Sequence, residues 1–143
     1  MIARNQRMKV NMEREGLPYN AERRWSYNSR LAQELAKWAE TKGKGEEVAN
    51  ALFRAYFVDV KNIGKPDVLA KIAEDNGLPP AEATDALASR GFKEPVDNDW
   101  RRCAAVGVNA VPTFLAGRYL MVGAQPYEEL ERLVQHAAKA DPA

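Results

Sequence analysis

The side chains best suited to nucleophilic or redox chemistry are scarce in this chain, which has one cysteine, Cys103, and one histidine, His136. A single cysteine excludes an intrachain disulfide and a CxxC pair within these residues, and a metal site built mainly from His and Cys is excluded as well. Cys103 shares a predicted helical face with Val96 and Trp100, which predicts a buried thiol. His136 falls toward the polar flank of the last predicted helix, without the partners of nucleophilic catalysis, and is expected to be exposed. The sequence therefore provides no candidate catalytic residue.

Two short segments contain residues that could bind a substrate. Val111, Pro112 and Thr113 open an apolar run, and because proline has no N–H, the backbone before it is free to pair with an extended peptide as an added strand. A trans proline that opens an edge strand is the alternative, and it is the more frequent arrangement for an isolated X–Pro pair. Asn28 either contacts a ligand or caps the helix that follows it, and its position favours the cap. Trp25 either lines a cleft or packs in the core.

Charge and composition limit the partners of the chain. Lys and Arg number 21 against 20 Asp and Glu in 143 residues, so the net charge is +1, which argues against a nucleic-acid partner but is compatible with a local basic patch. The arginine pairs Arg23-Arg24 and Arg101-Arg102 could hold a carboxylate or phosphate, although solvated helix surface is the expectation for both. Neither a long apolar segment nor a signal-peptide core is present, so we expect a cytoplasmic protein without a membrane partner.

The first three-quarters of the chain is predicted to be helical. Apolar spacing predicts one helix that ends at Gly16, one that begins after Asn28-Ser29, and one that begins near Glu46. The last of these has an apolar arc that includes Phe53 and Phe57, wide enough to predict burial on more than one side. Proline suits the first turn of a helix, and three shorter helices are expected to begin near such residues, namely Pro66, Pro80 and Pro95.

The pattern changes after Gly107. The runs Val111–Leu115 and Tyr119–Val122 flank a turn and predict a β-hairpin. A last helix should open at Pro126, with its apolar face formed by Tyr127, Leu130, Leu133, Val134 and Ala137. We therefore expect an α+β fold with two domains, a helical bundle over residues 1 to 106 and a hairpin with a terminal helix over residues 107 to 143.

A hairpin of this kind is not stable by itself, because an isolated pair of strands is marginal in water. Its edges carry apolar residues. Arg118 at the turn is the one charged residue that would oppose pairing of these edges with another strand. The hairpin therefore needs further strands. Either additional polypeptide precedes Met1, or another chain supplies them, most simply as a homodimer joined through the hairpin edge.

Several motifs resemble one known family. The segment from Ala105 to Phe114, with its Val-Pro-Thr-Phe sequence, and Gly123-Ala124-Gln125-Pro126 after the second strand resemble the C-terminal half of the DsbA-like thioredoxin superfamily. The similarity is greatest to the branch with the 2-hydroxychromene-2-carboxylate isomerases and the polyketide-pathway DsbA-like oxidoreductases. Leu52–Phe57 and Asn62–Gly64 resemble the helical insertion of that branch. The resemblance covers nearly the whole chain and implies a thioredoxin-like fold, with a cis Val111–Pro112 bond beside the nucleophile.

The same resemblance points to a missing part. The family begins with a βαβ unit whose first turn carries a CxxC in the oxidoreductases and a serine in the isomerase and kappa-class glutathione-transferase relatives. No such unit is found before the helices of this chain, so the resemblance implies that the active-site unit is lacking and that the chain is inactive alone. The absent strands are the ones that the hairpin needs.

Three functions follow from this resemblance. The first is thiol–disulfide exchange by an oxidoreductase of which this chain is a part. The second is an isomerase or glutathione-dependent enzyme of the same superfamily, with glutathione as a cofactor near the Val111-Pro112 loop. The third is a non-catalytic, truncated paralogue that serves as a binding module and pairs its hairpin edge with a second copy.

Overall fold

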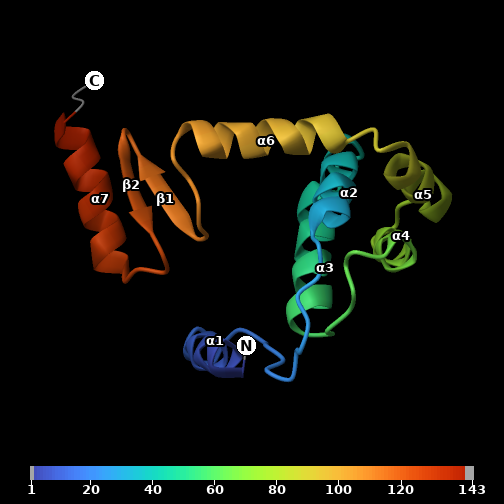
Figure 1. Cartoon of the computed structure of the whole chain (residues 1–143), viewed down its shortest axis with the longest axis horizontal. Coiled ribbons are helices and arrows are strands. Elements are labelled where there is room, and N and C mark those ends of the chain that lie inside the picture. The colour runs from blue at the N-terminus through green and yellow to red at the C-terminus, as the bar shows by residue number, and fades with distance from the viewer. Residues whose placement is uncertain (1, 141–143) are drawn as a thin grey trace. The chain divides into compact units, whose positions relative to one another are not determined.

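The computed structural model describes residues 2–140. Within that range the chain is a mixed α+β fold, as predicted (Figure 1). Its contacts form two compact units that divide between Asp97 and Asn98. The elements in chain order are α1 (Ile2–Arg14), α2 (Arg30–Thr41), α3 (Gly45–Phe57), α4 (Pro66–Asp75), α5 (Pro80–Ser89), α6 (Lys93–Ala105), β1 (Thr113–Ala116), β2 (Tyr119–Val122) and α7 (Tyr127–Ala140). None of these helices is both long enough and apolar enough to span a bilayer.

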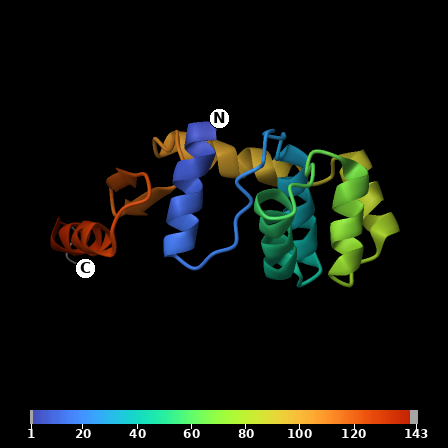
Figure 2. The ribbon, with the colours of Figure 1, turned by 90° about the horizontal axis from the view of Figure 1, so that it is seen from below.

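The core of the first unit lies among α2, α3, α4 and α5. Leu35 of α2, Val48 of α3 and Leu69 of α4 are completely buried. Figure 2 shows α2 and α3 running side by side, with α4 and α5 beyond them. Helices this short are marginal in isolation, so the shared apolar core stabilises all of them together. Its further members include Trp38, Leu52, Ile63, Ile72, Leu78, Ala83 and Leu87.

Local sequence signals set most helix ends. Pro66 and Pro80 are the first residues of α4 and α5, as predicted, because a proline there loses no intrahelical hydrogen bond. The helix predicted near Pro95 begins slightly earlier, at Lys93. The wide apolar arc of α3 was a wrong indication of burial at Phe53, whose surface is 63% exposed. Within the first unit, α3 packs mainly against α2 and α4, and this packing leaves most of the Phe53 side chain in solvent.

A buried carboxylate connects three helices of the first unit. Glu34 of α2 is 1% exposed, and its carboxylate accepts hydrogen bonds from Nε of Arg90 at 2.9 Å and from Nη2 of Arg90 at 2.7 Å. Arg30 donates its Nε to the same carboxylate at 3.1 Å and also pairs with Asp97 of α6. Arg90 ends α5 with a left-handed backbone (φ 56°), which directs the chain toward α6. The network therefore fixes α2, the end of α5 and the start of α6.

The second unit contains the predicted hairpin and the last helix. β1 and β2 are antiparallel, with Thr113 opposite Val122 and Ala116 opposite Tyr119. Gly117 takes a φ of 55° in the turn between them, a conformation that favours glycine. α7 packs against both strands. Among residues 2–140 the sheet has these two strands and no other, so the predicted shortage of strands is present in the described part of the chain.

The predicted apolar face of α7 is correct in part. Leu133 and Ala137 are buried, but Tyr127 and Val134 are 73% and 61% exposed, because the short hairpin covers only a narrow strip of the helix. His136 is exposed, as predicted, and its ring packs on Tyr119 with a centroid distance of 4.5 Å.

The prediction of a buried Cys103 is wrong, because this residue is exposed. Val96 is the buried residue of α6, whereas Trp100 on the same face is 55% exposed. Spacing correctly identified one face of α6 as apolar, but the core of the first unit reaches only the first turns of that face. The thiol therefore lies on the surface.

Replacing Glu34 by glutamine should lower the free energy of unfolding by about 2 kcal/mol, because both arginines lose their counter-charge next to a buried amide. The partial exposure of Arg90 keeps this loss below that of a fully buried pair. Urea unfolding followed by circular dichroism measures the change. Glu40→Gln, at an exposed position of the same helix, is the matched control and should cost less than about 0.5 kcal/mol. An equal loss in the two variants would contradict the role of the network.

The stabilisation by Glu34 should also depend on pH. The hydrogen bonds from Arg90, followed by those from Arg30, hold the pKa of the Glu34 carboxyl below its ordinary value of 4.5 against the opposing effect of burial. A carboxyl whose pKa is lower in the folded state stabilises the fold above the unfolded pKa, and this contribution is lost as the pH falls through the folded pKa. The difference in unfolding free energy between the unmodified chain and Glu34→Gln should therefore be constant from pH 7 to pH 5 and shrink below about pH 4.5. A difference that grows in acid would be inconsistent with this sign.

Candidate functional site

The segment Val111 to Thr113 leads directly into β1. The Val111–Pro112 peptide bond is cis. The carbonyl oxygen of Pro112 accepts the N–H of Gly123 at 2.8 Å, and the Thr113 hydroxyl donates to the carbonyl oxygen of Ala110 at 2.6 Å. These bonds fix the loop on both sides, while the Val111 side chain is 89% exposed. The loop is thus a rigid, accessible segment at the end of the sheet, and its part in binding a substrate stays a prediction.

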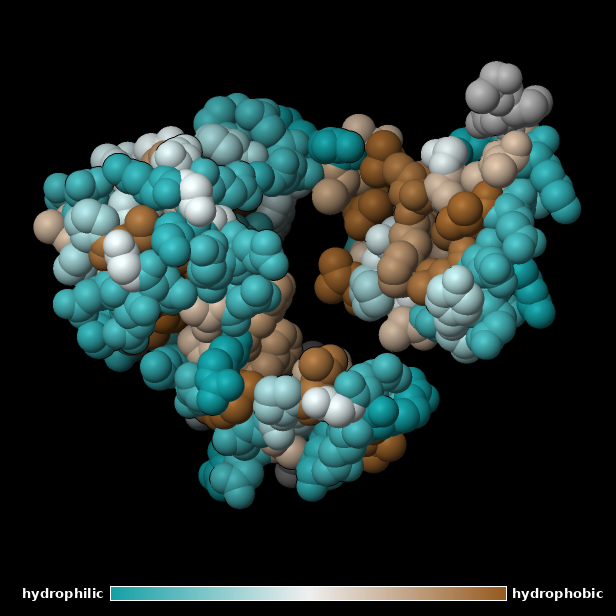
Figure 3. All heavy atoms as spheres, turned by 180° about the vertical axis from the view of Figure 1, so that it is seen from behind, coloured by the Kyte–Doolittle hydropathy of each residue, from teal (hydrophilic) through white to brown (hydrophobic). Residues whose placement is uncertain are grey.

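One face of the hairpin is apolar and uncovered. Side chains alternate between the two faces of a strand, and cross-strand partners share a face. Tyr119 and Met121 point to the side where α7 packs, so Leu120 and Val122 point to the other side, together with Leu115, the partner of Leu120. Leu115, Leu120 and Val122 are 51%, 38% and 50% exposed. Figure 3 shows the resulting apolar patch over the strands.

Asn28 and Trp25 lie in the segment between α1 and α2. The Asn28 Oδ1 atom accepts the backbone N–H of Arg30, the first residue of α2, at 2.9 Å. The N-cap position itself is Ser29, which makes no side-chain cap bond, so Asn28 bonds the helix start from one residue before the expected cap, and its role toward a ligand stays a prediction. A Cβ atom at Gly64 would lie 3.2 Å from the carbonyl oxygen of Asn28, which is tighter than most Cβ contacts, so a side chain there would require this backbone to shift by a few tenths of an ångström. Trp25 is 68% exposed, which excludes the core position.

Arg23 differs from the expectation of a solvated helical pair. It lies in the same extended segment and is 6% exposed. Its guanidinium is 4.4 Å from the centroid of the Tyr56 ring, donates to the Tyr56 hydroxyl at 2.6 Å, and donates to the carbonyl oxygen of Trp25 at 3.0 Å. An aromatic face and hydrogen bonds thus hold this cation, and they attach the segment that carries Trp25 to the end of α3. Arg101 and Arg102 are exposed on α6, as predicted.

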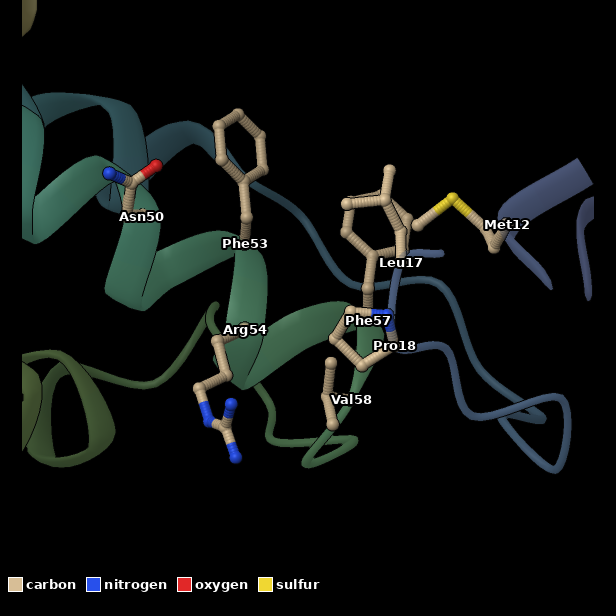
Figure 4. A pocket seen from close by; sticks show the side chains of 8 residues that line it. All are labelled: Met12, Leu17, Pro18, Asn50, Phe53, Arg54, Phe57 and Val58. Atoms are coloured by element: carbon tan, nitrogen blue, oxygen red, sulfur yellow. The ribbon is translucent and has the colours of Figure 1, made fainter. Parts of the chain in front are cut away.

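A pocket in the first unit was missed by the sequence analysis. It has a volume of about 480 Å³ and is lined by side chains of α1, of the segment after α1, of α3 and by Val58 directly after α3. Figure 4 shows Leu17 and Met12 near Phe57, whereas Phe53 and Arg54 point in opposite directions from α3. The lining side chains are Met12, Leu17, Pro18, Asn50, Phe53, Arg54, Phe57 and Val58. The available signal was the spacing of Phe53 and Phe57, four residues apart on a helix whose main apolar face already included Leu52 and Ala55.

The described residues contain few groups capable of covalent catalysis. Cys103 is an exposed free thiol. No group of three or more His, Cys, Asp or Glu side chains in the described part of the chain is arranged to hold a metal ion. The predicted binding residues divide between the two units, with Trp25 and Asn28 in the first and Val111, Pro112 and Thr113 in the second.

Comparison with known proteins gives the relatives of this fold. The chain is 31% identical over 110 residues to the uncharacterized protein YwbO of Bacillus subtilis, a match that covers 76% of this chain and 55% of YwbO. It superimposes on the crystal structure of a probable DsbA oxidoreductase from Streptomyces coelicolor with a TM-score of 0.86 and 25% identity, covering 99% of this chain and 62% of that one. The chain thus spans between half and two thirds of the length of these relatives.

A candidate protein disulfide isomerase from Nitrosomonas europaea shares the fold, with a TM-score of 0.69, 22% identity, and coverage of 94% of this chain and 72% of that one. The family model for the DSBA-like thioredoxin domain matches residues 2–135. That match includes every helix of the first unit, the Val111–Thr113 loop and the hairpin. The chain belongs to the DSBA-like thioredoxin domain family.

Proposed function

We propose that this chain is the substrate-positioning part of a DsbA-type thiol–disulfide oxidoreductase whose reactive dithiol comes from polypeptide outside these residues. The observation that supports this most directly is the exposed Val111–Thr113 loop at the end of an incomplete sheet, in a chain of the DsbA-like family. The chain is oxidoreductase-like by family, and its single cysteine cannot supply a dithiol.

The proposed chemistry assigns a positioning role to the loop. In exchange, a thiolate attacks one sulfur of a substrate disulfide and expels the other sulfur as a thiolate, and a second thiol then resolves the mixed disulfide. An extended substrate needs backbone partners while this takes place. Val111 is exposed, and Pro112 has no backbone N–H that could form a hydrogen bond to neighbouring residues of the chain. The backbone before β1 can therefore pair with such a strand.

The hairpin edge is the proposed site of assembly. β1 and β2 pair with each other along one side only within the described residues, and Leu115, Leu120 and Val122 form an uncovered apolar face. Additional strands, from the same polypeptide or from a second copy, would satisfy both the backbone groups and this face. In the absence of the dithiol unit the same edge supports the alternative function of a non-catalytic binding module.

We expect the chain by itself to show no catalysed reduction of insulin by dithiothreitol, because one thiol cannot complete the exchange cycle. Precipitation of the insulin B chain, followed by turbidity, measures the rate. Cys103→Ala is the control for the surface thiol and should give the same uncatalysed rate. Turnover that persists in Cys103→Ala would show that the reactive group is contained in these residues, which would overturn the proposal.

The hairpin edge should cause self-association of this chain when no other strands are supplied. We expect light scattering to give an average mass that rises with concentration, and Leu115→Lys to restore the monomer, because a charged residue on an exposed strand opposes edge pairing. Val134→Lys, at a similarly exposed position of α7, is the matched control and should leave association unchanged. A monodisperse monomer at all concentrations of the unmodified chain would contradict assembly through the edge.

A further inference from the structure

The segment that begins with Gly123 leads from β2 into α7 within the second unit (Figure 1). The N–H of Gly123 donates to the carbonyl oxygen of Pro112 at 2.8 Å. The side-chain Nε2 of Gln125 donates to the carbonyl oxygen of Val122 at 3.0 Å. These two hydrogen bonds lie at opposite ends of one group, the peptide that joins Val122 to Gly123. The Gln125 side chain is therefore connected to the loop through a single peptide group.

The hairpin register explains why this peptide group points in both directions. The register runs from Ala116 opposite Tyr119 at the turn to Thr113 opposite Val122. The pair next to a tight turn is hydrogen-bonded, and along an antiparallel ladder such pairs alternate with pairs that are not. By this alternation Thr113 and Val122 form a non-hydrogen-bonded pair, whose N–H and C=O groups point away from the partner strand. The Val122 carbonyl consequently points to the outer edge of β2, where Gln125 donates to it.

The hydrogen bond from Gly123 to Pro112 lacks its usual companion. A hydrogen-bonded pair of an antiparallel ladder exchanges bonds in both directions, but Pro112 has no N–H to donate. Within the described residues, the pairing of Pro112 with the strand opposite thus rests on the Gly123 N–H. A peptide group is planar, so turning its C=O also turns its N–H, and a donor at the C=O polarises the N–H. The bond that Pro112 accepts therefore depends on what holds the Val122 carbonyl.

The backbone at Gly123 brings the Gln125 amide to this carbonyl. Gly123 has a φ of 93°, a left-handed value that favours glycine. A Cβ atom at Gly123 would lie 3.6 Å from Nε2 of Gln125, so the amide lies directly beside the peptide group. The Gln125 side chain is exposed. Replacing it therefore removes a hydrogen bond without opening a cavity in the core.

We propose that Gln125 is a positioning residue for the Val111–Thr113 loop. Its amide holds the Val122–Gly123 peptide group, the N–H of that group holds the Pro112 carbonyl, and the backbone of Val111 is thereby presented to an extended strand. The inference rests on the proposed function, because the extended substrate strand is the occupant of the loop there. Gln125 itself is assigned no contact with the substrate.

NMR relaxation of the backbone amides in the whole chain tests this role through the order parameter at Val111. We expect a value typical of rigid backbone, about 0.85, in the unmodified chain, and a fall toward about 0.6 in Gln125→Met, which keeps the length of the side chain but has no donor. The Gly123 amide should also exchange with solvent about fivefold faster, because its bond to Pro112 weakens. Gln135→Met, at an exposed glutamine of α7, is the matched control and should change neither.

A blocked, uncharged peptide of alternating threonine and valine is the probe for the substrate strand. Its affinity, measured from the shift of the Val111 amide on titration, should be about fivefold weaker in Gln125→Met than in the unmodified chain or in Gln135→Met. Absence of binding to the unmodified chain would contradict the strand-pairing role of the loop in the proposed function. The role of Gln125 would still be decided by the order parameter at Val111, so the two proposals fail separately.

Three results would overturn the positioning role. The first is an order parameter at Val111 that does not fall in Gln125→Met. The second is an equal acceleration of amide exchange at Gly123 and at Met121 of β2, which would show a general loosening of the hairpin. The third is a peptide that binds the unmodified chain and Gln125→Met with the same affinity, which would disconnect Gln125 from the strand-pairing backbone.

Discussion

Unpaired backbone groups at the edge of a two-stranded sheet are the constraint on which the second unit of this protein depends. β1 and β2 form one ladder, and the outer N–H and C=O groups of each strand have no strand partner among residues 2–140. The α7 side of the ladder is covered, but the side with Leu115, Leu120 and Val122 is not. Groups of this kind need water or another strand, and apolar side chains next to them favour the strand. These features are the physical support for the proposal that further strands join this edge.

The first unit is under no such constraint. Leu35, Val48 and Leu69 are completely buried within it, and Glu34 has two arginine partners from the same unit. Helices that share a core of their own can keep their structure independently, whereas an isolated pair of strands is marginal in water. The pocket beside α3 lies in the self-sufficient unit, and the exposed hairpin edge lies in the other one.

The sequence predicted those features that local chemistry determines. Pro66 and Pro80 begin helices because proline fits the first turn, and Gly117 marks the hairpin because its left-handed backbone closes the turn. Periodicity also identified apolar faces correctly, but it could not show how far a neighbouring element extends over each face. Cys103 and Phe53 were therefore expected to be buried, although the packing of their helices ends before it reaches them. The missed pocket at Phe53 follows from the same limitation.

Buried charge is the other feature that sequence could not show, because its partners are distant along the chain. Glu34 and Arg90 are 56 residues apart, and Arg23 and Tyr56 are 33 apart. The positive charges of the two arginines are stabilised in different ways. An anion neutralises Arg90, whereas an aromatic face and two hydrogen-bond acceptors hold Arg23. The arrangement at Arg23 has a structural consequence. By stacking on Tyr56, Arg23 anchors the segment that contains both candidate residue Trp25 and pocket residue Leu17 to α3, so the local geometry of both surfaces depends on one cation that the sequence presents only as half of an arginine pair.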